Sequence, residues 1–136
     1  MYLLDTDTVI YSLKGQAAVQ RNLQDHLQDS LKISVITLME LYFGAYKSRH
    51  VAVNLAIVRK LESSFEIISI DKESTETFGM LKASLQKSGT PLDDFDLAIA
   101  ACALGNNLTL VTNNTKHFSR IEGLRISNWT VHSPRK

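Results

Sequence analysis

Acidic residues stand at three separate places in the chain where they could take part in chemistry. Asp5 follows the apolar run 2–4, Glu40 comes soon after the apolar run 33–36, and Asp96 lies at the start of a long apolar segment. Carboxylates brought close together repel one another and raise each other's pKa, and a divalent cation removes this penalty. Mg²⁺ and Mn²⁺ prefer oxygen ligands, often one or two carboxylates together with water and substrate phosphate. A bound ion can polarise a phosphoryl oxygen and lower the pKa of an attacking water, as cleavage of a phosphodiester requires.

The elements that would position these acids are short β-rich runs that alternate with longer helical segments. This alternation predicts an α/β fold, one domain over residues 1–136, with a mostly parallel central sheet flanked by helices. We expect strands at 2–5, 33–36, 65–70, 108–112 and 124–127, and helices at about 8–14, 17–28, 38–46, 51–62, 73–86 and 95–104. In an open parallel sheet, the carboxyl ends of the strands and the starts of the following helices share one edge, where ligands bind. The three acids are therefore expected to meet at that edge.

Each acid also has a purely structural interpretation. Thr37 and Glu40 have the spacing of a capping box, in which Glu40 would only stabilise a helix start. Asp93 and Asp96 have the spacing of a helix N-cap followed by an acid in the first turn, which the helix dipole favours. Asp5 could cap the helix after it. Residue types and spacing alone support the metal site and the capping roles about equally.

Composition limits the function classes. The 15 basic and 14 acidic residues give a net charge of +1, which is not the basic footprint of a simple nucleic-acid binder. A polyanion would therefore have to be attracted by a metal ion or by a local basic patch. The single cysteine, Cys102, lies in an apolar run and is expected to be a buried thiol. No apolar stretch approaches the ~20 residues of a membrane span, and the N-terminus shows no targeting signal, so we expect a cytoplasmic protein.

Four sequence blocks in a fixed order carry a family resemblance. They are YLLDTDTVI at 2–10, ISVITLMELYFG at 33–44, GTPLDDFDLAIAA at 89–101 and LVTNNTKHF at 110–118. With these blocks the chain resembles the PIN-domain ribonucleases over nearly its whole length. Within that family, it is most similar to the VapC-type toxins of bacterial toxin–antitoxin pairs. The resemblance implies a single PIN-like ribonuclease domain.

The resemblance also implies roles for individual residues. Asp5, Glu40 and Asp96 match the catalytic acids that hold Mg²⁺ or Mn²⁺, and Thr6 and Thr112 match small polar residues that line the site. Members of the family are metal-dependent endoribonucleases that commonly cut structured RNA such as tRNA or rRNA and thereby inhibit translation. A cognate antitoxin usually blocks them, and homodimers are common.

The chain departs from the family pattern at several positions. Asp7 stands where the family often has asparagine, which adds a negative charge near the first acid. Where many members place a further acid after the fourth strand, this chain has Asn113 and Asn114, and an asparagine can hold a water but contributes no charge. Asp93 and Asp94 could supply part of the missing charge. The number of metal ions is therefore left open, with Asp93 and Asn114 as secondary site candidates.

Other polar and aromatic residues are weaker candidates. His117 neighbours the proposed site but is expected to be non-catalytic, whereas His26, His50 and His132 are expected at the surface. Basic residues near elements that could flank the site are candidates for phosphate contacts or for simple surface charge: Lys14, Lys47, Arg49, Lys116 and Arg120. Three aromatic residues at helical spacing could stack on bases, although this spacing favours a core or dimer surface: Tyr42, Phe43 and Tyr46.

Two other functions remain open at this point. Asp5 and Asp7 match the D-x-D opening of haloacid dehalogenase-like phosphatases, in which the first acid is a nucleophile and the second an acid/base. That hypothesis leaves Glu40 and Asp96 without a role. Alternatively, a non-catalytic PIN module would bind RNA or a partner protein without cutting.

Overall fold

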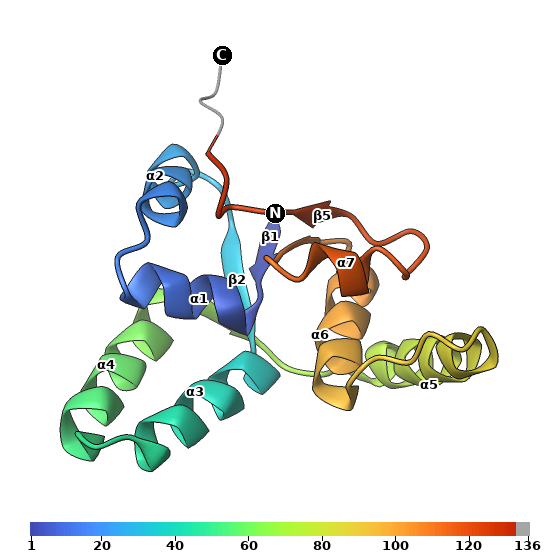
Figure 1. The fold of residues 1–136 in the computed structure, drawn as a ribbon, viewed down its shortest axis with the longest axis horizontal. Coiled ribbons are helices and arrows are strands. Elements are labelled where there is room, and N and C mark those ends of the chain that lie inside the picture. The colour runs from blue at the N-terminus through green and yellow to red at the C-terminus, as the bar shows by residue number, and fades with distance from the viewer. Residues whose placement is uncertain (133–136) are drawn as a thin grey trace.

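The computed structural model describes residues 1–132, which form a wholly parallel five-stranded sheet with helices on both faces (Figure 1). The strands are β1 (Tyr2–Leu4), β2 (Leu31–Ser34), β3 (Glu66–Ile68), β4 (Thr109–Val111) and β5 (Ile126–Ser127), in the spatial order β3-β2-β1-β4-β5. The first strand therefore lies at the centre of the sheet, between β2 and β4. This arrangement confirms the predicted α/β class with a parallel sheet.

The helices that connect these strands are α1 (Thr6–Leu13), α2 (Ala17–Asp25), α3 (Val35–Lys47), α4 (Val51–Ser64), α5 (Lys72–Lys87), α6 (Asp94–Gly105) and α7 (Thr115–Phe118). Within the described residues, none of them is long and apolar enough to cross a membrane. The short helix α7 was not expected from the sequence, because its four residues are too few to show a helical period.

Alternation along the strands divides the core into two layers. In β1, Leu3 belongs to a cluster with residues of α5 and α6, and Leu4 belongs to a cluster with residues of α1, α2, α3 and α4. In β4, Leu110 and Val111 divide between the same two clusters. Successive side chains of a strand point to opposite faces, so both faces of the central strands are covered by helices.

Helix α6 is the most deeply buried helix of the core. Its residues Leu97 and Ile99 to Ala103 are buried, in agreement with the expectation that this helix is apolar on most faces. Cys102 is one of them, which confirms the predicted buried thiol. Because the alanines are small, α6 can approach its neighbours closely, and it packs against α5. The acidic start of this helix is therefore attached to a well-packed support.

The start of α3 differs from the sequence prediction. The strand β2 ends at Ser34 and α3 begins at Val35, whereas the sequence indicated a strand through Ile36 and a helix from Leu38. Ser34 is the N-cap, and its hydroxyl accepts a hydrogen bond from the Thr37 N–H at 3.1 Å. Strand and helix thus follow each other without a loop, and the β-branched residues 35–37 belong to the helix.

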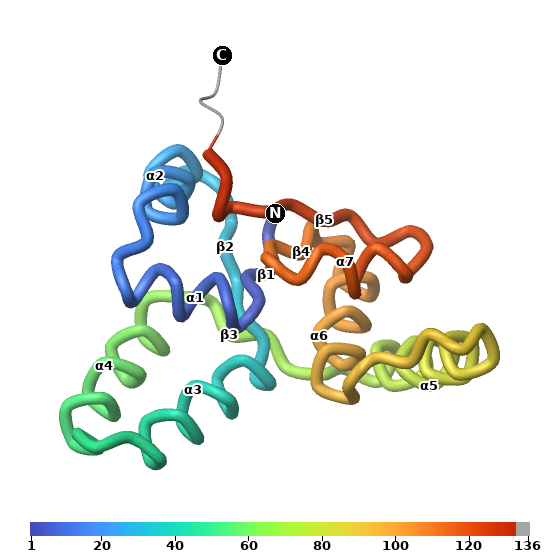
Figure 2. Tube along the Cα trace, viewed as in Figure 1, coloured from blue at the N-terminus to red at the C-terminus, as the bar shows by residue number. Residues whose placement is uncertain are grey.

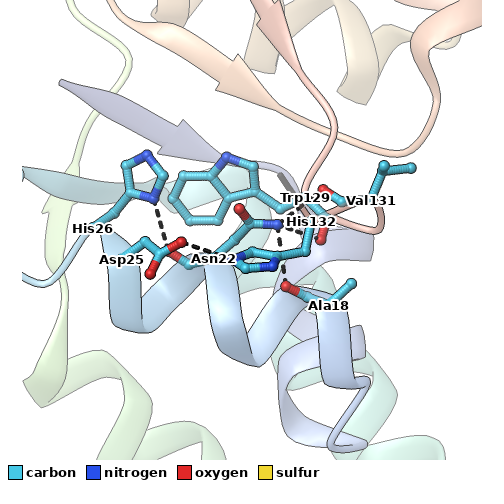
Figure 3. A network of polar contacts seen from close by, with 7 residues as sticks. All are labelled: Ala18, Asn22, Asp25, His26, Trp129, Val131 and His132. Carbon is cyan, nitrogen blue, oxygen red and sulfur yellow. Dashed lines mark hydrogen bonds and ion pairs between the residues drawn. The ribbon is translucent and has the colours of Figure 1, made fainter. Parts of the chain in front are cut away.

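The segment after β5 is fastened to α2 beside the start of β1 (Figures 2 and 3). The Asn22 side-chain amide donates to three backbone carbonyls, those of Ala18, Trp129 and Val131, at 3.0–3.1 Å. The His26 ring stacks on the Trp129 ring with centroids 4.5 Å apart. His132 contacts the Asp25 carboxylate at 2.7 Å, and its side chain is mostly buried. The expectation that these two histidines are simple surface residues was therefore wrong.

Candidate functional site

Asp5 is placed at the centre of the sheet edge where β1 ends. It is the N-cap of α1, and its Oδ1 accepts a hydrogen bond from the Thr6 N–H at 2.8 Å. Its Oδ2 accepts from the Thr112 hydroxyl at 2.8 Å, directly after the neighbouring strand β4. Asp5 is only 5% exposed. The capping interpretation of Asp5 is thus confirmed, and the same carboxylate interacts electrostatically with Asp7 and Asp96.

Asp7 lies in the first turn of α1, two residues after Asp5, and joins this helix to the segment after β4. Its Oδ2 accepts from the Asn113 N–H at 3.0 Å and lies 3.4 Å from the Thr112 hydroxyl. The Asn114 N–H donates to the same Thr112 hydroxyl at 3.0 Å. The secondary candidate Asn114 therefore takes part through its backbone, and Thr112 stands between Asp5 and Asp7.

Glu40 reaches the same place from α3. The Thr6 hydroxyl donates to Glu40 Oε1 at 2.7 Å and lies 3.1 Å from the Thr37 hydroxyl. The capping-box interpretation of Glu40 is wrong, since the cap of α3 is Ser34 and Glu40 is the sixth residue of the helix. Thr37, which we had assigned only to the cap, is a fully buried member of the site that sequence reasoning missed.

The acidic start of α6 separates into three different environments. Asp93 is the N-cap, and its carboxylate accepts from the Phe95 N–H at 3.1 Å. Asp94 forms an ion pair with Lys82 of α5 at 3.0 Å. Asp96 is partly buried and interacts electrostatically with Asp93, Glu40, His117 and Asp7. Asp96 is therefore the member of the group that faces the other acids.

The acids shift one another's protonation. Burial and, after it, the charges of Asp7 and Asp96 raise the pKa of Asp5 from its ordinary 3.8 to about 7, against the lowering by hydrogen bonds from Thr112 and Thr6. The pKa of Asp96 is also raised, first by burial and then by the charges of Asp93 and Glu40, against a lowering by His117. Among the described residues, no lysine or arginine forms an ion pair with Asp5, Asp7, Glu40 or Asp96. The site therefore combines several acids that have no lysine or arginine as an ion-pair partner among the described residues.

The donor set suits a hydrated divalent ion. Within residues 1–132, no three histidine, cysteine or acidic side chains lie close enough together to enclose a metal ion. Mg²⁺ usually keeps several of its waters and binds through only one or two carboxylates, so a site without three enclosing ligands can still hold it. The side chains of this site are carboxylates or hydroxyls, which are hard oxygen donors.

The candidates for RNA contact lie around this site at varying distances. Phe43 and Tyr46 are exposed on α3, while Tyr42 is partly buried and donates to Glu62 at 3.1 Å. Lys14 and Lys47 lie at the far ends of α1 and α3. Lys116 and Arg120 lie in and just after α7, which begins beside Thr112.

The parallel sheet, the acids at the carboxyl ends of its strands and the order of the helices are the features by which this chain can be compared with known families. The family model for the PIN domain matches residues 2–124. The chain belongs to the PIN-domain family.

The similar proteins narrow the class further. The chain is 38% identical over 128 residues to the tRNA(fMet)-specific endonuclease VapC of Salmonella typhimurium, covering 94% of this chain and 97% of the relative. It is 36% identical over 129 residues to the protein of the same name from Shigella flexneri, covering 95% and 98% of the two chains. A chain of the crystal structure of DNA-bound VapBC from Salmonella typhimurium superposes with a TM-score of 0.88 at 36% identity, over 94% of this chain and 97% of that one. The VapC resemblance read from the sequence is therefore confirmed.

Proposed function

We propose that this protein is a Mg²⁺- or Mn²⁺-dependent endoribonuclease and the toxin of a VapBC-type toxin–antitoxin pair. Relatives that match nearly its full length are named as VapC endonucleases, and a similar solved structure is a VapBC complex. The similarity to these relatives supports RNA cleavage as the reaction, and the carboxylates of the site support the use of a divalent metal ion.

One observation carries the proposal: Asp5 is buried among other acids with no protein cation to neutralise it. Holding such a carboxylate ionised costs free energy in the absence of a counterion. A site that serves only to cap a helix has no need for the further acids Glu40 and Asp96. The arrangement is what a divalent cation would stabilise.

We assign the roles as follows. Asp5, Glu40 and Asp96 would hold the ion, directly or through water, and Asp93 would add negative charge from the start of α6. When bound, the ion would polarise the phosphoryl oxygens and favour deprotonation of an attacking water. Attack of that water on phosphorus breaks the bond to one ribose oxygen and leaves two RNA ends.

The hydroxyl groups have a positioning role. Thr112 donates to Asp5 and Thr6 donates to Glu40, so each hydroxyl orients a ligand oxygen without adding charge. Such outer hydrogen bonds fix the direction of a ligand and increase its order before the ion binds. Thr112 and Thr6 are therefore positioning residues in this proposal.

The proposed substrate is a structured RNA, with tRNA the first candidate. Two relatives bear the name tRNA(fMet)-specific endonuclease, and cleavage of such an RNA would inhibit translation. The proposed partner is a cognate antitoxin, as the VapBC complex suggests. A homodimer remains a prediction, and the exposed side chains of Phe43 and Tyr46 are candidates for its interface.

The alternatives receive less support. In the phosphatase hypothesis Asp7 would be the acid/base, yet it lies within α1 with its carboxylate engaged by the Thr8 hydroxyl and the Asn113 N–H. A non-catalytic module would not require the acids at all three positions to be present. The phosphatase and the module are distinguished from the nuclease by the experiment below.

The test is cleavage of tRNA and total RNA by the purified protein in Mg²⁺, Mn²⁺ or EDTA. Discrete fragments should appear with either metal and be lost in EDTA and in the Asp5→Asn, Glu40→Gln and Asp96→Asn variants. The matched control is Asp94→Asn, because its carboxylate is adjacent in sequence but turned toward Lys82. Absence of cleavage by the wild-type protein, or cleavage unchanged in all three variants, would refute the proposal.

A further inference from the structure

A groove of about 670 Å³ opens between the last turns of α5 and the segment that follows α7, and its wall includes Thr90, in the loop that leads to the acidic start of α6. Its polar wall contains the side chains of Ser84, Ser88, Thr90, Arg120 and Glu122, and its floor is apolar. Hydroxyl groups and a guanidinium are groups that bind the phosphates and riboses of nucleic acids. No role for this groove follows from the metal site itself.

Arg120 connects the groove to the acidic site. Its Nη1 donates to the backbone carbonyl of Pro91 at 3.4 Å, and Pro91 lies two residues before the N-cap Asp93. The turn that carries Arg120 is held in place because Phe118 and Ile121 on either side are buried. The guanidinium is therefore fixed at the junction between the groove and the start of α6.

The charge of Arg120 is also available. No ion pair between described residues includes Arg120, although Glu122 lines the same groove. The other nearby cations are placed differently: Lys82 is paired with Asp94. Lys14 and Lys47 lie at the C-terminal ends of α1 and α3, and Lys14 lines a different groove, together with Glu40. Arg120 is thus a cation without an ion-pair partner among the described residues, and four of its five N–H donors remain for a ligand.

We propose that this groove binds the RNA strand that flanks the scissile phosphate, with Arg120 as a phosphate ligand. The proposal rests on the ribonuclease function proposed above and extends its substrate-binding surface. Ser84, Ser88 and Thr90 donate hydrogen bonds to the ribose–phosphate backbone, and Lys116, four residues before Arg120 on the same turn, adds positive charge. Glu122, two residues after Arg120 on the same segment, repels the strand and weakens its binding. These contacts position the RNA without reading its sequence.

The test measures RNA binding separately from cleavage. A fluorescent tRNA is titrated with the Asp5→Asn protein in EDTA at several KCl concentrations, with and without Arg120→Ala. We expect Arg120→Ala to weaken binding about tenfold and to reduce the slope of log K against log salt by about 1. Arg120→Lys should retain most of the affinity, and Glu122→Gln should increase it. The matched control is Arg21→Ala, which removes the same charge from exposed α2 on the opposite side of the molecule (Figure 1).

A kinetic readout follows from the same geometry. In the protein with its acids intact, Arg120→Ala should raise KM for tRNA and leave kcat unchanged, since Arg120 touches the flanking strand and no reacting atom. Cleavage of a dinucleotide, which is too short to reach the groove, should be the same in both proteins. Equal melting temperatures show that the substitution leaves the fold intact.

The outcomes separate this inference from the proposed function. If the wild-type protein cuts RNA while Arg120→Ala matches Arg21→Ala in affinity and salt slope, the groove proposal is overturned and the nuclease stands. If Arg120→Ala weakens an antitoxin but not RNA, the groove is a protein surface and the proposal is also overturned. If RNA binding falls as expected but the wild-type protein never cuts, the groove stands and the nuclease fails.

Discussion

Neutralising Asp5 should stabilise the metal-free protein, although it destroys the proposed metal site. Burial among acids raises the pKa of Asp5 to about 7 in the folded protein, against an ordinary 3.8. The folded state therefore holds a proton more tightly than the unfolded chain, and stability must fall as the pH rises from about 4 to about 7. At 1.36 kcal/mol for each pH unit, the full loss is about 4 kcal/mol.

The Asp5→Asn variant avoids this loss because its side chain stays neutral. Asparagine can still accept from the Thr6 N–H, but its amide group meets the Thr112 hydroxyl, and one weaker hydrogen bond costs about 1 kcal/mol. We expect the free energy of unfolding to exceed that of the wild-type protein by about 3 kcal/mol at pH 8 in EDTA. At pH 4 both side chains are uncharged, so the two proteins should be about equal or the variant slightly weaker.

The assay is urea unfolding of both proteins between pH 4 and pH 8, compared as a difference so that other titrating groups cancel. Mg²⁺ at about 100 times its dissociation constant should then add about 2.7 kcal/mol to the wild-type protein at pH 8 and far less to the variant. A difference that does not change with pH would refute the reasoning, because Asp5 would then not be a desolvated carboxylate. A variant less stable than the wild type at pH 8 would refute it equally.

Three further predictions concern the residues around this carboxylate and the end of the described chain. Asp7→Asn removes a charge that raises the pKa of Asp5, so the acid limb of the pH–rate profile for RNA cleavage should move to lower pH; an unchanged limb would contradict the coupling. Thr6→Val removes the hydrogen bond to Glu40 and should lower kcat about 10-fold or more, with a change of only about 1 kcal/mol in unfolding free energy. An unchanged kcat with a loss of stability would instead indicate a merely structural role. Asn22→Ala removes three hydrogen bonds and should cost about 2–3 kcal/mol in urea unfolding followed by fluorescence of the single tryptophan, and a loss below about 0.5 kcal/mol would contradict that estimate.

Much of the fold follows from local patterns in the chain. The alternation of short β-rich runs with helices predicts the parallel sheet, and the strand-edge rule places Asp5 and the start of α6 near each other. The order of the strands does not follow from these patterns, because the position of β1 between β2 and β4 depends on pairings between distant segments. Local propensity contains no information about such pairings.

The sequence indicated the acids of the candidate site and the hydroxyls of Thr6 and Thr112, but not the hydroxyl of Thr37. The run 33–37 is rich in β-branched residues and favours a strand, so the helix start was placed too late and Thr37 was assigned to a capping box. In the structure Ser34 takes that role, and Thr37 is left to contact Thr6. The capping hydroxyl of Ser34 was the signal available, but propensity opposed it.

The central place of β1 has a consequence for the order in which the protein is made. Asp5 is synthesised 107 residues before Thr112, whose hydroxyl orients it, and β1 lacks one of its two neighbours until β4 exists. Contacts of such long sequence separation form late in folding, because the loop between them must be closed first. A nascent chain in which β4 has not yet been made contains Asp5, Glu40 and Asp96, but Asp5 still lacks the hydrogen bond from Thr112 that orients it. The proposed nuclease site is therefore still unassembled while the ribosome synthesises the chain.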